Sequence, residues 1–247
     1  MPAWLVRALA LVLALASVCW GVAVFPVVWR GRAIEATADL ILQGQRFQTA
    51  DIAAEVARTE ADGFVAKASV RRSLTTLELR LVEDALEQGD RLSLDKRFAA
   101  LKSAAVALFE VDPADSFFWL IYYWCQLTTE GFSPSQLKLL ELSYDLGPNE
   151  GWVAIKRNRL ALPVMSELPA GMRERVVEEF AGMVAAGLIV DAAASLVSAS
   201  APVREKLLAG LGRVPIAERE RLARYLTDAT TIDVVVPGVK PAEKRFY

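Results

Sequence analysis

Apolar side chains recur every three or four residues along most of the chain after Arg32, and this spacing is the strongest limit on its fold. In residues 67–88 the apolar residues form one helical stripe that ends before Gly89, a residue suited to stopping a helix. We expect similar helices near 34–47 (with a break at Gly44), 49–59, 95–110, 113–129, 134–146, 148–162, 171–187, 189–199, 202–212 and 215–229. Strand-like alternation is confined to Ile232–Val236, and no alternation of strands with helices is present. The sequence therefore predicts an all-α protein.

Two segments of the sequence repeat each other 35 residues apart. In each segment a proline, an aromatic residue and an aliphatic residue share the same spacing: Pro113, Phe117 and Leu120, then Pro148, Trp152 and Ile155. Proline suits the first position of a helix, where its missing N–H costs no hydrogen bond. We therefore expect helices to begin at the two prolines, with Asp112 capping the first of them.

A period near 34 with proline at the junction of a helix pair resembles the tetratricopeptide family. The stretch from Gly44 to Ala50 also looks like that family's mid-hairpin glycine, aromatic residue and alanine, with one additional residue. The resemblance covers residues 35–60 and 95–162. It implies stacked helical hairpins, arranged either as a solenoid or as an irregular helical bundle.

A narrower resemblance concerns residues 146–160 and the later Glu178-Glu179-Phe180 run. These segments look like small anchored helical proteins of bacterial exopolysaccharide and O-antigen loci. The resemblance implies an accessory role, facing the periplasm, beside a polysaccharide polymerase, ligase or export complex.

The N-terminal segment has no charged residue over the 22 positions from Ala8 to Trp29. At about 1.5 Å per residue, such a helix is long enough for a hydrocarbon core of roughly 30 Å. We expect residues 1–32 to form a transmembrane anchor, residues 33–230 a helical-repeat-like domain, and residues 231–247 an extended C-terminal tail. A signal peptide cleaved near residues 14–17, or a lipoprotein box ending at Cys19, is the alternative.

The orientation of this anchor follows from the short tail that precedes Arg7. A tail of this length is easily left in the cytoplasm, although Arg30 and Arg32 balance Arg7 in the positive-inside count. We expect a single-pass protein of the bacterial inner membrane whose body faces the periplasm.

The charge and the residue inventory exclude several classes of function. The formal net charge is −2 with both signs intermixed, so nothing favours nucleic acid as a partner. The chain has no histidine and lacks phosphate-binding and dinucleotide-binding glycine motifs. Cys125 has no histidine to activate it, and Cys19 is too distant in sequence for a plausible bridge. We therefore expect no enzyme activity, with no catalytic, cofactor-binding or metal-binding residue.

Two groups of residues are candidates for binding a partner or a sugar. The first is the aromatic cluster of residues 117–124, and the second is a basic group beside an aromatic residue on the following repeat. The favoured explanation is structural for both groups: a core between helical hairpins for the aromatic cluster, and a solvated helix face for the basic group. The candidates are Trp119, Tyr122, Tyr123, Trp152, Lys156, Arg157 and Arg159.

These observations together predict a membrane-anchored, non-enzymatic scaffold that docks partner proteins, in envelope polysaccharide synthesis or export. The alternative is a carbohydrate-binding module that uses the aromatic cluster of residues 117–124, because Tyr and Trp combine a large apolar face with a polar group.

Overall fold

A computed structural model describes residues 3–61, 67–229 and 234–240 of the chain. Within those ranges the protein is all-helical and contains no strand, which confirms the fold class predicted from the apolar periodicity. The arrangement is helical-repeat-like and compatible with a tetratricopeptide-like fold. The chain divides into two compact units, Met1–Pro113 and Ala114–Tyr247.

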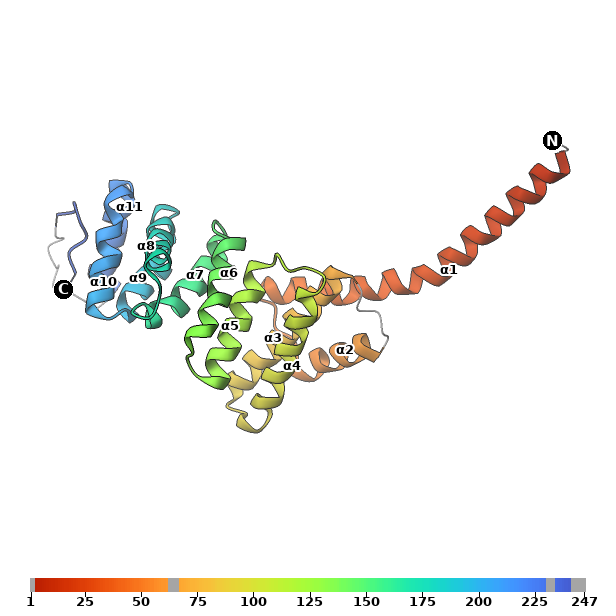
Figure 1. Cartoon of the computed structure of the whole chain (residues 1–247), viewed down its shortest axis with the longest axis horizontal. Helices are drawn as coiled ribbons and strands as arrows, with labels where there is room; N and C mark the ends of the chain where they lie inside the picture. The colour runs from red at the N-terminus through yellow and green to blue at the C-terminus, as the bar shows by residue number, and fades with distance from the viewer. Residues whose placement is uncertain (1–2, 62–66, 230–233, 241–247) are drawn as a thin grey trace. The chain divides into compact units, whose positions relative to one another are not determined.

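The first unit is built around its third helix (Figure 1). It contains α1 (Ala3–Leu42), α2 (Thr49–Ala61), α3 (Ala68–Gln88) and α4 (Arg91–Phe109), and α3 packs against the other three. Its core combines apolar side chains from three helices: Ile34 and Ala38 of α1, Ile52 and Val56 of α2, and Val70, Leu74, Leu77 and Leu81 of α3. The apolar stripe predicted for residues 67–88 thus supplies the α3 part of this core, although α3 also buries polar residues outside the stripe and Leu86 is exposed.

The turns between these helices follow from local sequence signals. Gly44 and Gly89 have positive φ angles of 88° and 67°, which glycine adopts without steric cost, and each lies just beyond a helix end. Asp90 then caps α4 by accepting a hydrogen bond from the Ser93 N–H at 3.3 Å. This cap explains why α4 begins at Arg91, four residues before its predicted start.

The predicted transmembrane anchor is wrong. In the part of the chain that the structure describes, no helix is both long and apolar enough to cross a membrane. The uncharged run is also not a separate element, because α1 continues as one helix of 40 residues through Arg32 and Glu35. Beyond residue 32 this helix buries Ile34 and Ala38 in the core, and Glu35 accepts a hydrogen bond from Ser69 at 2.6 Å.

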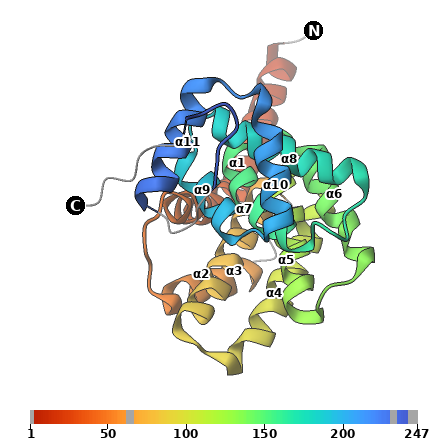
Figure 2. The ribbon, with the colours of Figure 1, turned by 90° about the vertical axis from the view of Figure 1, so that its left-hand side faces the viewer.

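The second unit packs its helices around α8. Its elements are α5 (Ser116–Glu130), η1 (Pro134–Gln136), α6 (Leu137–Leu146), α7 (Gly151–Ala161), η2 (Leu162–Val164), α8 (Ala170–Ala185), α9 (Ile189–Ser198), α10 (Ala201–Ala209), η3 (Gly210–Arg213) and α11 (Ile216–Ala229). The helices α5 and α6 form a hairpin, and α8 contacts α7, α9, α10, η3 and α11 (Figure 2). The α8 side chains Val176 and Phe180 are completely buried.

The internal repeat is visible as two equivalent helices. The helices α5 and α7 begin at Ser116 and Gly151, which keeps the spacing of 35 residues. The expectation that they begin at the prolines is wrong, because Asp115 caps α5 by accepting hydrogen bonds from the N–H groups of residues 117 and 118. The equivalent aromatic rings of Phe117 and Trp152 lie against each other, with centroids 4.6 Å apart.

Part of the predicted C-terminal tail packs against the second unit. Residues 234–240 are described and form no helix, but Val236 is buried and the Pro237 carbonyl accepts a hydrogen bond from Arg219 Nη1 at 2.7 Å. The rest of the predicted tail, residues 231–233 and 241–247, lies outside the described residues.

Gly147, between α6 and α7, provides a test of the packing in the second unit. A Cβ atom at this position would lie less than 3.0 Å from both Cβ and Oγ of Ser116. We predict that Gly147→Ala lowers the free energy of unfolding by about 1–3 kcal/mol, the usual cost of overpacking. Chemical denaturation measures the change, and Gly171→Ala in the open first turn of α8 is the control. Equal effects of the two substitutions would contradict the predicted clash.

Glu78 on α3 provides a pH test of the first unit. Its side chain is only 5% exposed, and Oε2 has no hydrogen-bond partner among the described residues. Burial raises the pKa of Glu78, although Arg97 opposes the shift. The folded protein therefore holds this proton more tightly than the unfolded chain, so stability falls as pH rises from the ordinary carboxyl range through the raised pKa.

We predict that Glu78→Gln raises the melting temperature at about pH 8 and has little effect at about pH 4, where the carboxyl group is already protonated. Thermal melts of the full chain measure both values. Asp95→Asn, at an exposed position of α4, is the control. An increase of the same size at both pH values would show that titration of Glu78 is not the cause.

Candidate functional site

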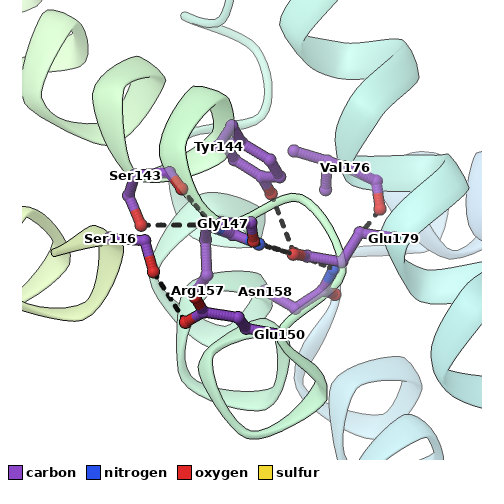
Figure 3. A network of polar contacts seen from close by, with 9 residues as sticks. All are labelled: Ser116, Ser143, Tyr144, Gly147, Glu150, Arg157, Asn158, Val176 and Glu179. Carbon is purple, nitrogen blue, oxygen red and sulfur yellow. Dashed lines mark hydrogen bonds and ion pairs between the residues drawn. The ribbon is translucent and has the colours of Figure 1, made fainter. Parts of the chain in front are cut away.

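A buried ion pair joins α7 to α8 at the centre of the second unit (Figure 3). Arg157 on α7 is fully buried, and its Nε donates to Oε1 of Glu179 on α8 at 2.8 Å. The remaining guanidinium donors reach α6 and the loop after it: Nη1 donates to the Ser143 hydroxyl at 3.2 Å, and Nη2 to the Gly147 carbonyl at 2.9 Å. One side chain therefore holds three consecutive helices.

The second carboxylate oxygen of Glu179 is also satisfied. It accepts hydrogen bonds from the Tyr144 hydroxyl at 3.0 Å and from Asn158 Nδ2 at 3.3 Å. Asn158 Nδ2 also donates to the Val176 carbonyl on α8 at 3.3 Å. The partners of the Glu179 carboxylate come from α6 and α7, so its hydrogen bonds form only when both helices are in place against α8.

The electrostatics of this network follow from its burial. Burial raises the pKa of Glu179, while Arg157 and the hydrogen bonds from Asn158 and Tyr144 oppose the shift. Burial and the adjacent Glu179 carboxylate raise the pKa of Tyr144 well above its ordinary value. The Arg157 guanidinium lies 4.3 Å from the centroid of the Tyr144 ring, close enough for a cation–π contact. Tyr144 thus remains a neutral hydrogen-bond donor at physiological pH.

A second polar contact links the two repeats. The Ser116 hydroxyl at the start of α5 donates to Oε2 of Glu150, the residue before α7, at 2.8 Å (Figure 3). The two residues lie within the repeated segments, and their contact accompanies that of the Phe117 and Trp152 rings. The repeat therefore produces a direct contact between equivalent helix starts.

The structure separates the three basic candidates. Lys156 and Arg159 are exposed, and Arg159 forms a weak 3.4 Å ion pair with Asp191. Arg157 is buried, so the expectation that it belongs to the same solvated face is wrong. Its place in the helix explains this, because Arg157 follows the buried Val153 by four residues and precedes the buried Ala161 by four.

The same periodicity identifies the residues that the sequence analysis missed. Glu179 follows the buried Val176 by three residues and precedes the buried Met183 by four, which places its carboxylate on the inner stripe of α8. Asn158 and Tyr144 occupy comparable inner positions on α7 and α6. The sequence signal that could have identified these residues is therefore a polar residue at a position that continues the apolar stripe of its helix.

The aromatic candidates form interior packing rather than one exposed face. Tyr123 is fully buried, while Trp119 and Tyr122 are partly buried. Burial raises the pKa of Tyr123. Trp152, by contrast, keeps 46% of its surface exposed. Of the aromatic candidates, Trp152 therefore presents the largest exposed fraction to a partner.

Residues of α8 line two clefts. The larger, here called the α8/α10 groove, lies between α8 and the α10–η3 segment and has a volume of about 900 Å³. The smaller cavity, of about 370 Å³, lies between α8 and the start of α7 and reaches the Tyr144 and Glu179 side chains. Glu178 and Gly182 line both clefts. Adjacent residues of α8 thus point to different environments, with Glu179 buried and Glu178 exposed.

Among the described ranges, no group of three or more Cys, Asp or Glu side chains is placed to hold a metal ion. No protein-family model matches the chain, and neither does any curated protein or solved structure.

The buried ion pair can be tested by removing one or both partners. Glu179→Ala leaves the Arg157 charge buried and unpaired, so we predict a loss of about 3–5 kcal/mol in the free energy of unfolding of the second unit. Replacing both residues by leucine should cost less than Glu179→Ala alone, because no charge is then left unpaired. Tyr144→Phe removes one hydrogen bond and should cost about 1 kcal/mol.

Amide hydrogen exchange along α7 and α8 of the full chain localises these losses to the second unit. Arg159→Ala, on the exposed face of α7, is the matched control and should change little, since its ion pair is exposed. If the double leucine variant were less stable than Glu179→Ala, the unpaired charge would not be the cause of the loss.

Proposed function

We propose that the chain is a non-enzymatic scaffold whose second unit docks a partner protein. The observation that carries this proposal is the contrast between the two sides of α8. Its inner side is fixed by the Arg157–Glu179 network, whereas its outer side lines an open groove of about 900 Å³. A rigid helix with an exposed outer face is a preorganised docking surface, because little conformational entropy is lost when a partner binds.

The exposed face of α7 supports the same proposal. Trp152 and Lys156 are exposed on this helix, and Trp152 is held in place by its contact with Phe117. Tryptophan with part of its surface exposed and its ring fixed is a typical anchor of a protein interface. Stacked helical hairpins also present extended surfaces of this kind to partner proteins.

For the process, we propose envelope polysaccharide synthesis or export, with a polymerase, ligase or export component as the partner. This part of the proposal rests on the resemblance of residues 146–160 to accessory proteins of those loci. The docking proposal does not depend on it.

Photocrosslinking in the native cell tests both parts. A photoreactive amino acid is placed in the full-length protein at Ala185, at Lys156 and, as a control, at Leu92 of α4, which is 98% exposed. We expect Ala185 or Lys156 to crosslink one defined protein that Leu92 does not. A partner from another process would contradict only the polysaccharide assignment. The absence of a specific product at both test positions would contradict the scaffold function.

A further inference from the structure

The α8/α10 groove has the length of a helical peptide. The α8 residues that line it recur in steps of three or four over the whole helix, from Ala170 through Val177 and Ala181 to Ala185. At about 1.5 Å per residue this stripe is roughly 22 Å long, or about four helical turns. The groove is open to solvent rather than enclosed, whereas a small-molecule site encloses most of its ligand.

Small residues form a part of the lining that is here called the floor of the groove. Ala181, Gly182 and Ala185 belong to it from α8, and Ala209 and Gly210 from α10 and η3. The helix α8 also touches η3, since a Cβ atom on Gly210 would lie under 3.0 Å from Cγ1 of Val177. Side chains of this size leave hollows, so an occupant must supply the larger apolar side chains that fill them, as knobs fill holes in helix packing.

The two walls of the groove carry opposite charges. Glu174 and Glu178 are exposed on the α8 wall, and Lys206 and Arg213 are exposed on the α10–η3 wall. None of these four side chains has an ion-pair partner within the described part of the chain. Arg173 also lines the α8 wall, but its Nη1 donates to the Leu168 carbonyl at 2.6 Å. An occupant therefore meets an acidic wall on one side and a basic wall on the other.

We infer that the α8/α10 groove binds an amphipathic α-helix of a partner protein, with a basic edge along α8 and an acidic edge along α10 and η3. The inference rests on the proposed scaffold function and specifies the partner that it docks. The apolar face of that helix inserts leucine-sized side chains between the small residues of the floor. An added β-strand is a poorer fit, because the backbone groups of α8 are already bonded within the helix and offer no sheet edge.

Three synthetic peptides test this assignment on the full-length protein. Each has about 16 residues and the same leucine–alanine face, and the edges are one basic and one acidic, both basic, or both acidic. Fluorescence anisotropy gives the dissociation constants. We expect the peptide with one basic and one acidic edge to bind about tenfold more tightly than the other two, because each exposed ion pair contributes a small increment.

Charge reversal of one wall should move this preference in a defined direction. Glu174→Lys with Glu178→Lys makes both walls basic, so the doubly acidic peptide should become the tightest ligand. Lys206→Glu with Arg213→Glu makes both walls acidic, so the doubly basic peptide should become the tightest. If the ranking of the peptides stayed the same in both variants, the walls would not recognise the edges and the inference would be wrong.

Filling the floor is a separate test of where the peptide lies. Gly182→Leu places a large side chain in the groove and should weaken all three peptides, whereas Gly171→Leu lies on the same helix outside the groove and should not. Equal weakening by both substitutions would exclude the groove as the binding site. Hydrogen exchange along α8 verifies that each variant remains folded.

The peptide assay and the crosslinking experiment can fail independently. Crosslinks from Lys156 to a specific protein, combined with no peptide preference, would overturn the helix-binding groove and leave the scaffold function in place. The predicted peptide ranking, combined with no crosslinked partner in the cell, would support the groove's recognition chemistry and overturn the scaffold function.

Discussion

The buried pair of Arg157 and Glu179 is the interaction on which the second unit depends. Removing two charges from water costs several kcal/mol for each ion, and only a nearly complete set of hydrogen bonds offsets that cost. Ser143, Tyr144 and Asn158 provide donors and acceptors for this pair from α6 and α7. Because a displaced helix would leave a buried charge unsatisfied, the network restricts α6, α7 and α8 to one arrangement.

The same constraint determines which surface α8 presents. With Glu179 held inward, the preceding residue, Glu178, is exposed and lines the groove. Gly147 and Gly210 allow the close approaches that this arrangement requires, since a Cβ at either position would overlap a neighbouring side chain. The buried polar network and the proposed docking surface thus lie on two sides of α8, and the network fixes the rotation of α8 about its own axis.

Much of the secondary structure was predictable because helix boundaries are set by local interactions. The stop at Gly89 and the spacing of 35 residues between α5 and α7 are confirmed. The starts of these two helices were misplaced. The cap at Asp115 competes with a proline start for α5, and α7 begins at Gly151 without a side-chain cap from Glu150. The predicted transmembrane anchor was wrong, because no helix among the described residues is both long and apolar enough to cross a membrane. The apolar run is part of α1, which continues to Leu42 and contributes Ile34 and Ala38 to the core.

The sequence by itself determined that the chain is all-helical, where most helices lie and which residues repeat, because apolar periodicity and caps act over a few neighbouring residues. Only the tertiary structure decided which partners Arg157 meets in the core: Glu179, Ser143 and the Gly147 carbonyl. It also decided that Glu174 and Glu178 line the same groove as Lys206 and Arg213. Partners that lie far apart in the sequence meet only when helices pack, and the sequence pattern within one helix carries no record of the helix opposite.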